Sequence, residues 1–353
     1  MTIEPGDRVL VTGASGFIGS AVTRALVQRK ARVVALVQPS ADQKMLAGLP
    51  VETVEADLRE RARVVEAVRD CRFVFHVAAI YRFWRPRPEE FYEVNVGGTL
   101  NVLEAALRAG SERVVYTSTV GTIGLDHSGS TSNGGLSPAS EIHWPRVEHL
   151  FGLYKQSKYV AEHEVLRAGA EGLPVVLVQP TLPVGPGDAA PTPTGRTMLD
   201  FLNGRMPAYV DTAMNVVDVE DVAAGHLLAA ELGRQGRSYV LGGENLSFRE
   251  ILGLLADITG LPPPRVRIPA GATLAAAYVS ETLEGRIARR PPHVPLEAVR
   301  MSTTKMVYDD SRAREELGYE SRPARDALSR SARWFADNRY VTERRLRKLR
   351  WRD

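Results

Sequence analysis

Short runs of apolar, mostly β-branched residues alternate with longer segments of mixed polarity through the first half of the chain. The runs are Val9–Thr12, Val33–Val37, Val51–Glu55, Phe73–Val77, Val114–Thr117 and Val175–Gln179. In most of them the apolar residues follow one another, which is typical of strands that helices cover on both faces. Strands separated by helix-length segments indicate βαβ units. We therefore predict an α/β fold with a doubly wound parallel sheet.

A change in amino-acid composition after Gln179 indicates a second lobe. Prolines and glycines crowd residues 180–195, and such residues interrupt regular elements. Strand-like runs at Asn215–Val219 and Tyr239–Leu241 are expected to rejoin the first domain, while Phe248–Thr259 is expected to belong to the second lobe. We divide the chain into a first domain (1–180 and 213–243), a smaller discontinuous lobe (181–212 and 244–340) and a basic tail (341–353).

Composition and charge exclude several classes of protein. Hydrophobic residues make up 44% of the 353 residues and charged residues 25%, which is ordinary for a globular protein. The 45 basic and 42 acidic side chains leave a net charge of only +3, so nucleic-acid binding is not indicated. A single cysteine, Cys71, excludes an intrachain disulfide and a cysteine-based metal cluster, and we assign no metal ligand. Residues 1–8 lack the features of a secretory signal and no apolar run is long enough to span a bilayer, so we expect a cytoplasmic location.

A glycine-rich turn directly follows the first predicted strand and opens a helix. Its sequence, Thr-Gly-Ala-Ser-Gly-Phe-Ile-Gly at residues 12–19, lets the backbone turn tightly and approach a pyrophosphate, while the start of the helix offers free N–H groups. The order of strand, motif and helix favours a dinucleotide site over a glycine turn without a ligand. The residues expected to contact the cofactor here are Gly13, Ser15, Gly16, Phe17, Ile18 and Gly19.

The ends of three further strands bear on the same cofactor, because open α/β sheets bind ligands at the carboxyl ends of their strands. An NAD site usually has an acid at the end of the second strand, but this chain has Gln38. The missing carboxylate favours NADP(H) over NAD(H), although no arginine stands there either. The candidates at the next two strand ends are Asp57, Leu58, Val77, Ala78 and Ala79. A cap of the following helix is the alternative role for Asp57.

A tyrosine, a lysine and a serine form the candidate catalytic set. Tyr154 and Lys158 lie four residues apart in a helical segment and therefore share a face. The pKa of a free phenol is about 10, and a nearby ammonium lowers it by roughly 1 to 3 units. Ser118, at the end of the fifth strand, is expected to orient the substrate carbonyl while Tyr154 donates or accepts its proton.

The order and spacing of these motifs resemble the extended short-chain dehydrogenase/reductases. The Gly-x-x-Gly-x-x-Gly turn, Ser118, the Tyr154/Lys158 pair and an Asn-Val-Gly-Gly-Thr element that begins at Asn95 carry the resemblance. It implies a Rossmann-type cofactor domain, hydride transfer with a nicotinamide cofactor, and a homodimer that packs through helices around residues 91–109 and 148–169. The further cofactor contacts that it implies are Asn95, Thr117, Tyr154, Lys158, Pro180, Thr181 and Leu182.

Within that superfamily the chain is most similar to the dihydroflavonol reductase-like group, in particular to the bacterial hopanoid-associated sugar epimerases. The strings that carry this likeness include residues 76–79, 191–196 and 204–212. Related sugar dehydratases have an Asp-Glu pair where this chain has Val120 and Gly121, and the Asn that epimerases place after the sixth strand is replaced. We therefore favour an NAD(P)H-dependent ketone or aldehyde reductase, or a secondary alcohol dehydrogenase. The alternatives are a sugar epimerase of hopanoid or related lipid biosynthesis and a non-catalytic dinucleotide sensor.

Aromatic residues after the fourth strand indicate where the substrate binds. The residues assigned to the substrate pocket are Tyr81, Phe83, Trp84, Thr119, Met206 and Tyr209. Such a lining suits a small apolar or aromatic metabolite, although packing in a core explains the aromatic side chains and Met206 equally well.

Three other features have open interpretations. The polar loop 126–135 is either a lid or a surface insertion. The basic end, residues 344–352, is interpreted as a solvated tail in preference to a contact with an anionic membrane. Asp218 stands where the family that the chain resembles commonly has His, a difference that bears on the junction between the lobes.

Overall fold

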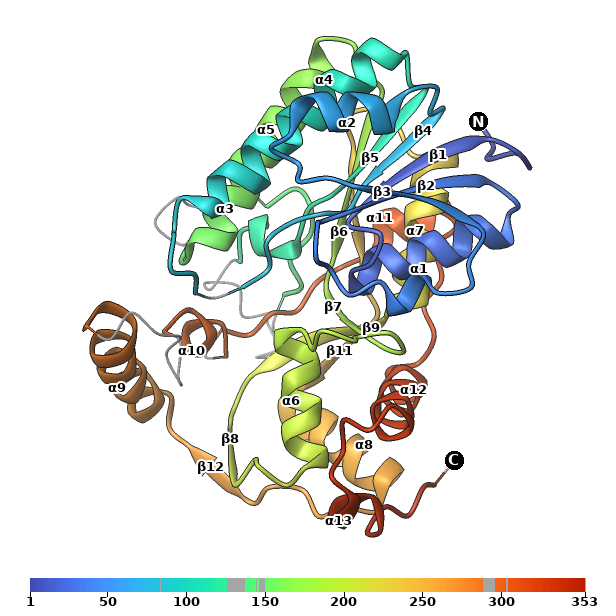
Figure 1. Cartoon of the computed structure of the whole chain (residues 1–353). Coiled ribbons are helices and arrows are strands. Elements are labelled where there is room, and N and C mark those ends of the chain that lie inside the picture. Colours follow the sequence, from blue (N-terminus) through green and yellow to red (C-terminus); the bar gives the residue numbers. More distant parts are fainter. Residues whose placement is uncertain are drawn as a thin grey trace.

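A seven-stranded parallel sheet forms the centre of the fold. The computed structural model describes residues 1–82, 84–125, 137–143, 145, 150–287, 296–302 and 304–352. The strands lie in the order β10-β6-β5-β4-β1-β2-β3 (Figure 1). Their bounds are β1 Arg8–Thr12, β2 Arg32–Val37, β3 Val51–Glu55, β4 Phe73–His76, β5 Arg113–Thr117, β6 Val175–Pro180 and β10 Ser238–Leu241. The strands β2 and β3 follow β1 on one side of it, whereas β4, β5 and β6 follow on the other side. Open α/β sheets bind ligands at such a change in strand order, which lies here between β1 and β4.

The predicted α/β, Rossmann-type fold is confirmed. Each of the six apolar runs forms a strand whose ends lie within one residue of the predicted bounds. The agreement follows from burial: β1, β2, β4, β5 and β6 are covered on both faces, so most of their residues are apolar and the polar ones lie at or near the strand ends.

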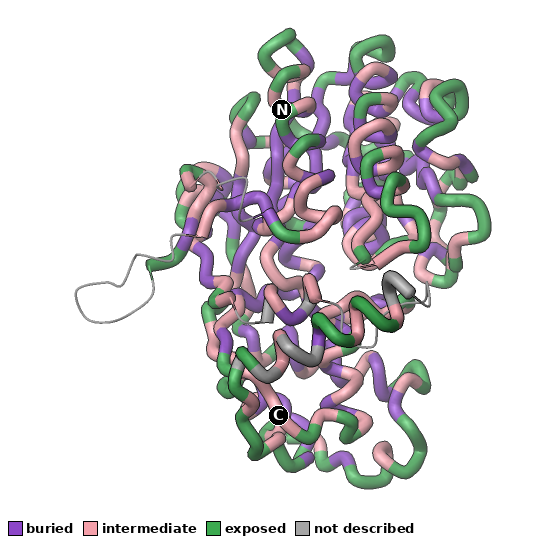
Figure 2. The backbone as a smooth tube through the Cα atoms, turned by 90° about the vertical axis from the view of Figure 1, so that its left-hand side faces the viewer, coloured by how far each residue is buried: buried purple, intermediate pink, exposed green. Residues whose placement is uncertain are grey.

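Helices cover both faces of this sheet (Figure 1). On one face lie α1 (Phe17–Gln28), α7 (Val219–Leu232) and α11 (Ser311–Leu317). On the other lie α2 (Arg61–Val68), α4 (Thr99–Ala109) and α5 (Leu153–Ala170). Figure 2 shows buried residues concentrated along the strands and the inner sides of these helices. The sheet therefore separates two hydrophobic cores and holds its strand ends rigidly.

A second, smaller lobe lies beyond the carboxyl ends of the strands (Figure 1). It contains a three-stranded sheet in the order β11-β9-β7 and a two-stranded sheet of β12 and β8. The strand bounds are β7 Leu182–Val184, β8 Ala208–Val210, β9 Ala213–Asp218, β11 Glu244–Ser247 and β12 Val266–Ile268. The helices are α6 (Pro193–Leu202), α8 (Phe248–Thr259), α9 (Ala270–Ser280), α10 (Leu296–Ser302), α12 (Ala324–Asp337) and α13 (Glu343–Leu346).

Strand β9 departs from the prediction for residues 215–219. We expected this run to rejoin the first domain, as β10 does by pairing with β6, but β9 pairs with β7 and β11 in the smaller sheet. The reason is that its side chains serve two cores: Val216 packs in the core of the second lobe, and Val217 packs in a core of the main sheet. The pattern of a buried strand was visible in the sequence, but its partners were not.

Asp218 joins the two parts of the molecule at the end of β9. Its side chain is fully buried, accepts a hydrogen bond from the backbone N–H of Glu220 at 2.8 Å and caps α7. It also accepts a hydrogen bond from Arg330 of α12 at 2.9 Å. Burial raises the pKa of Asp218 to about 6. The cost of desolvating the carboxylate therefore offsets part of the free energy gained from the contact with Arg330. The carboxylate at this position thus ties α7 to the second lobe.

The basic carboxyl-terminal segment is docked, so the interpretation as a solvated tail was wrong. Val341 and Leu349 are buried in the core of the second lobe, and Trp351 packs against that core with Arg333 over its ring at 4.9 Å. The backbone N–H of Arg350 donates to Thr259 of α8 at 2.8 Å. Apolar residues at intervals among the arginines explain the docking.

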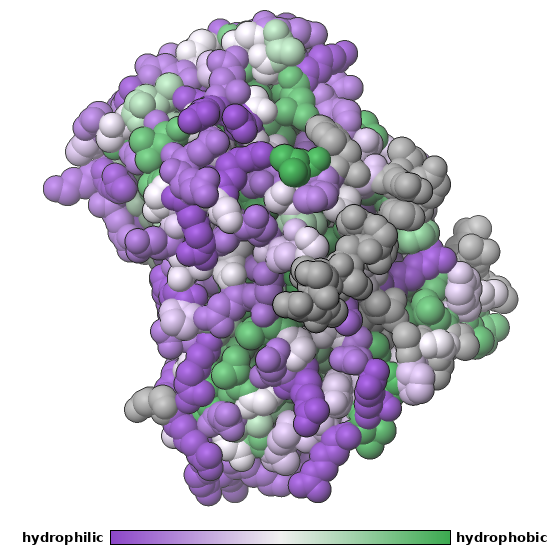
Figure 3. All heavy atoms as spheres, turned by 180° about the vertical axis from the view of Figure 1, so that it is seen from behind, coloured by the Kyte–Doolittle hydropathy of each residue, from purple (hydrophilic) through white to green (hydrophobic). Residues whose placement is uncertain are grey.

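Several expectations are not tested by this fold. Phe83 and the loop 126–135 lie outside the described residues. No helix in the described part of the chain is long and apolar enough to cross a membrane. On the face turned away in Figure 1, hydrophilic side chains cover most of the described surface, with smaller hydrophobic areas between them (Figure 3). The cytoplasmic location and the homodimer stay predictions.

Candidate functional site

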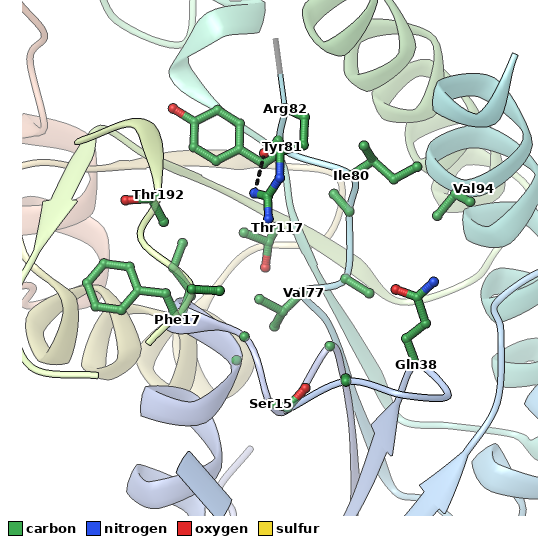
Figure 4. Close-up of a pocket in the computed structure, with 18 of the residues that line it drawn as sticks. Ser15, Phe17, Gln38, Val77, Ile80, Tyr81, Arg82, Val94, Thr117 and Thr192 are labelled. Carbon is green, nitrogen blue, oxygen red and sulfur yellow. Dashed lines mark hydrogen bonds between the residues drawn. The ribbon is translucent and has the colours of Figure 1, made fainter. Parts of the chain in front are cut away.

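The carboxyl ends of the main-sheet strands open into a cleft of about 610 Å³. Gln38 and Thr192 lie on opposite sides of it, with Ser15 and Val77 between them (Figure 4). The predicted cofactor residues that line it are Gly13, Ser15, Gly16, Phe17, Ile18, Gly19, Gln38, Asp57, Leu58, Val77, Ala78, Ala79, Thr117, Tyr154, Lys158, Pro180, Thr181 and Leu182. Ser118, Thr119 and Tyr81 also line it. The structure therefore brings nearly all predicted site residues to one place.

The glycine turn lies against the end of β4 too closely for side chains. Gly13 has a φ of 65°, and a Cβ there would come within 2.8 Å of the Cα of Ala78. A Cβ on Gly19 would overlap the carbonyl oxygen of Gly13. Because both positions need glycine, the backbone can turn directly from β1 into α1 and aim the start of that helix at the cleft. This cradle fits a pyrophosphate.

A threonine that the sequence reasoning missed holds the two strand ends together. The Thr12 hydroxyl accepts hydrogen bonds from the backbone N–H groups of Val77 and Ala78, both at 3.1 Å, and contacts His76 Nδ1 at 2.8 Å. His76 Nε2 in turn contacts Thr99 at 2.9 Å. Burial lowers the pKa of His76 to about 3, so this ring is neutral and structural. The sequence did contain an indication of this role, because Thr12 ends the first strand immediately before the glycine turn.

Asp57 and Gln38 lie toward the end of the cleft where the adenosine half of a dinucleotide would bind. Arg59 donates to both Asp57 oxygens, at 2.9 and 2.7 Å, and these bonds hold the pKa of Asp57 below its usual value. The first residue before α2 is Glu60, and no side chain caps that helix, so the alternative role of Asp57 as its cap is wrong. Asp42, which we had not predicted, borders the same end.

Asn95 does not face the cleft, in contrast to the expectation from the resemblance. It is 1% exposed, accepts a hydrogen bond from the backbone N–H of Ile80 at 2.8 Å and donates one to the Ser157 hydroxyl at 2.9 Å. It lies in a π-helical stretch, Glu93–Gly98, that leads into α4. Asn95 therefore fixes the segment after β4 to helix α5, which carries Tyr154, and so acts on the site indirectly.

Tyr154 is the second residue of helix α5 and lines the cleft beside Tyr81, whose ring centre is 4.8 Å away. Burial raises the pKa of Tyr154 to about 12, and a hydrogen bond with the Thr119 side chain works in the opposite direction. We expected the Lys158 ammonium to lower the pKa of Tyr154, but it has no such effect here. The phenol is therefore protonated at neutral pH in the ligand-free protein.

Lys158 is buried below the cleft and bonds to β5. Its ammonium donates to the hydroxyl of Tyr116 and to the carbonyl oxygen of Thr117, both at 2.7 Å. Burial lowers its pKa to about 7, against the opposing charge of Glu162. These contacts set the position of Lys158 relative to Tyr154, one turn earlier on the same helix.

The two hydroxyls after β5 point in different directions. Ser118 is 4% exposed, and its hydroxyl donates to Glu162 at 2.5 Å, together with Thr122 at 2.8 Å. Thr119 is the hydroxyl that lies beside Tyr154. Ser118 is thus held by a buried carboxylate, a geometry that does not suit the role we predicted for it. Successive side chains of an extended segment face opposite ways, and the sequence did not show which hydroxyl lies beside Tyr154.

The predicted substrate residues are only partly brought together. Trp84, Met206 and Tyr209 line neither the cleft nor the adjoining cavities, and the last two pack against the core of the second lobe, where Tyr209 meets Phe248. Tyr81, Thr119 and Tyr154 instead line a small cavity of about 50 Å³ next to the cleft. The residues of its wall that the sequence reasoning missed are Lys155, Met214, Asn215, Met306 and Tyr308.

The segment after β7 closes the cleft from the second lobe. Gly187, Asp188 and Thr192 line it, and Asp188 accepts two hydrogen bonds from the backbone N–H and one from the hydroxyl of Thr192. Burial raises the pKa of Asp188 to about 6. This proline-rich segment was predicted as a passage between lobes but not as a wall of the site.

Comparisons with known proteins agree with this geometry. The model of the NAD dependent epimerase/dehydratase family matches residues 9–242. A Synechocystis protein named as a dihydroflavonol 4-reductase is 42% identical over 96% of this chain and 97% of its own length. The sterol demethylase protein B of Methylococcus capsulatus is 36% identical, with 93% and 98% covered. The 2-alkyl-3-oxoalkanoate reductase of Stenotrophomonas maltophilia is 30% identical, with 88% and 94% covered.

Solved structures show the same fold. The crystal structure of gox2253 superposes with a TM-score of 0.83 at 42% identity, covering 96% of this chain and 100% of that one. A nucleoside-diphosphate-sugar epimerase from Pseudomonas aeruginosa gives a TM-score of 0.75 at 28% identity, with 95% and 99% covered. The Synechocystis relative confirms the predicted likeness to the dihydroflavonol reductase group, because it carries that name. The likeness to the hopanoid-associated subgroup stays a prediction.

The burial of Lys158 predicts a pH dependence of stability. Its pKa of about 7 in the folded chain is below the value of about 10.4 for an unfolded lysine, so the unfolded state binds more protons between these values. The free energy of unfolding should therefore gain from this group as the pH rises from about 7 to 10, by up to about 1.4 kcal/mol per pH unit. The gain should disappear in Lys158→Met and persist in Lys44→Met, where the lysine is exposed. Urea denaturation of the ligand-free proteins across this range measures it, and equal slopes in all three proteins would contradict it.

Proposed function

The chain belongs to the NAD dependent epimerase/dehydratase family and is an NAD(P)-dependent oxidoreductase of the extended short-chain dehydrogenase/reductase type, and we propose that it reduces ketones with an apolar body. The observation that carries this proposal is the small cavity at Tyr154. A phenol and the Thr119 hydroxyl lie side by side in it, and its described lining contains no Asp or Glu. Proton donation to a carbonyl needs the hydroxyls, whereas elimination of water needs a further acid–base group.

The neighbouring side chains support an apolar substrate. Leu182, Met214, Met306 and the ring of Tyr308 form much of the wall around the two hydroxyls. The relative from Stenotrophomonas is named for a 3-oxoalkanoate, which is a ketone on an aliphatic chain. We extend that chemistry to this chain as a proposal.

Thr119, Tyr154 and Lys158 take part in the proposed reduction. A bound nicotinamide supplies the hydride, and the glycine turn and the strand ends fit its dinucleotide. Thr119 donates a hydrogen bond to the carbonyl oxygen, and Tyr154 gives that oxygen its proton as the alkoxide forms. Burial keeps Tyr154 protonated at neutral pH, which is the form that reduction requires. The Lys158 ammonium would offset the negative charge that Tyr154 then carries.

We also propose NADP(H) as the preferred cofactor. The neutral Gln38 side chain borders the adenosine end and can donate to a 2′-phosphate. Asp42 works against this preference, but Lys44 lies 3.3 Å from its carboxylate and offsets part of its charge. Arg59 is engaged by Asp57 and Glu93 and is therefore not assigned to the phosphate.

Absorbance of the reduced cofactor in the presence of a panel of aliphatic and aromatic ketones tests the proposal. We expect stoichiometric oxidation of the cofactor with formation of the alcohol, and a lower KM for NADPH than for NADH measured in parallel. Conversion of a sugar substrate without net oxidation would instead establish an epimerase. Tight NADPH binding without turnover of any compound would establish a sensor.

The two hydroxyls after β5 provide a sharper test of the site. Thr119→Val keeps the shape of the side chain but removes the hydroxyl beside Tyr154, so kcat should fall by about 10²- to 10³-fold, as for loss of one oxyanion donor. Ser118→Ala removes a donor to the buried Glu162 and should mainly lower the melting temperature. Steady-state kinetics and thermal unfolding of both variants measure the two effects. The reverse pattern would assign the substrate hydroxyl to Ser118, as the sequence alone suggested.

A further inference from the structure

A second cavity lies next to the reaction site and has no part in the proposed function so far. Its volume is about 310 Å³, and it lies between the segment after β5, the start of α5 and α10. Much of its wall is apolar, with Ile123, Leu150 and Phe151 among the residues. Three ionisable side chains, Lys155, Glu297 and Arg300, also face it. A cavity of this size holds a substantial part of a metabolite.

Lys155 lies in the wall that this cavity shares with the cavity of the reaction site. It follows Tyr154 directly in α5 and lines both the second cavity and the small cavity that contains Tyr154 and Thr119. Its stem lies along Gly121, where a Cβ would come within 3.3 Å of Lys155 Cγ. Among the described residues its ammonium has neither a hydrogen bond nor an ion pair within 4 Å. A half-buried lysine that lines both cavities is available to pair with an anionic group of a substrate.

Glu297 is the acidic side chain in the wall of this cavity, and it forms no ion pair with Lys155 within 4 Å. Its carboxyl is packed against Gly152, where a Cβ would overlap it, and its Oε1 has no hydrogen-bond partner in the described structure. Burial raises the pKa of Glu297 and lowers the pKa of Lys155, while the charge of each group opposes the shift of the other. A bound carboxylate would give Lys155 the direct partner that Glu297 does not provide.

Arg300 adds a second positive charge to the same cavity. Its guanidinium lies over the ring of Phe151 at 4.4 Å and donates a hydrogen bond to the Tyr278 hydroxyl at 2.9 Å. The described lining thus contains two basic side chains, Lys155 and Arg300, and one acidic side chain, Glu297. The cavity therefore combines apolar walls with ionisable groups.

We propose that Lys155 binds the carboxylate of an oxo-acid substrate, and that the second cavity receives the rest of the acid's apolar body. This inference rests on the proposed function, since it takes the carbonyl to lie at Tyr154 and Thr119. Because those two residues and Lys155 line one cavity of about 50 Å³, the carbonyl and the carboxylate belong to one short segment of the substrate, as in a 3-oxo acid. Lys155 forms the direct pair with the carboxylate.

A matched pair of substrates tests this inference: a 2-alkyl-3-oxo acid and its methyl ester, which has the same body without the charge. For the natural chain we expect kcat/KM with NADPH to be at least tenfold higher for the acid, since a charge-assisted pair is lost in the ester. In Lys155→Met and Lys155→Gln the ratio of acid to ester should fall to within about threefold of unity, mainly through the KM for the acid. Lys305→Met, which removes an exposed lysine next to the cavity residue Met306, should keep the original ratio.

Other outcomes separate this inference from the proposed function. Equal rates for acid and ester in the natural chain, or an equal loss for both in the Lys155 variants, would overturn the carboxylate site and leave ketone reduction standing. If no ketone is reduced at all, calorimetric titration of the acid and the ester into the NADP⁺ complex decides the matter. Tighter binding of the acid that depends on Lys155 supports the site, and equal binding overturns it.

Discussion

The absence of side chains at Gly13 and Gly19 is the constraint on which the site depends. Backbone atoms of the turn meet the end of β4 and each other at distances that admit no Cβ. The Thr12 hydroxyl completes this junction by accepting two hydrogen bonds from the segment after β4. Because the two central strands end together in this way, the start of α1 faces the cleft, and the neighbouring strand ends can contribute their residues to the same edge.

The reaction corner is built by two layers of polar groups. The upper layer, Tyr154 and Thr119, faces the cleft, and the lower layer is buried. In the lower layer Lys158 is bonded to β5, while Glu162, one turn further along α5, accepts from Ser118 and Thr122. The buried layer fixes α5 against the end of β5, so that the phenol and the hydroxyl above it stay in register. Asn95 secures the same helix from the other side.

The sequence predicted the parts of this arrangement that depend on local pattern. Apolar runs identified the strands of the main sheet because burial on both faces confines polar residues largely to the strand ends. The order of motifs placed Tyr154 and Lys158 on one helix. It could not predict features decided by tertiary contact. The partners of β9, the inward turn of Ser118 and the docking of the basic segment depend on which core a side chain enters. Met206 and Tyr209 show the same limit, since an apolar residue in a lobe fills a core as readily as a pocket.

In the proposed reaction the Tyr154 phenol gives its proton to a ketone, while other residues hold the dinucleotide. Replacement of Tyr154 by Phe separates these two roles, with turnover and the Kd for NADPH measured on the same preparation. We predict that kcat falls by about 10²- to 10⁴-fold, the usual contribution of a positioned acid, while the Kd for NADPH changes by less than about threefold. Turnover near that of the natural chain, or loss of NADPH binding in parallel with activity, would contradict it.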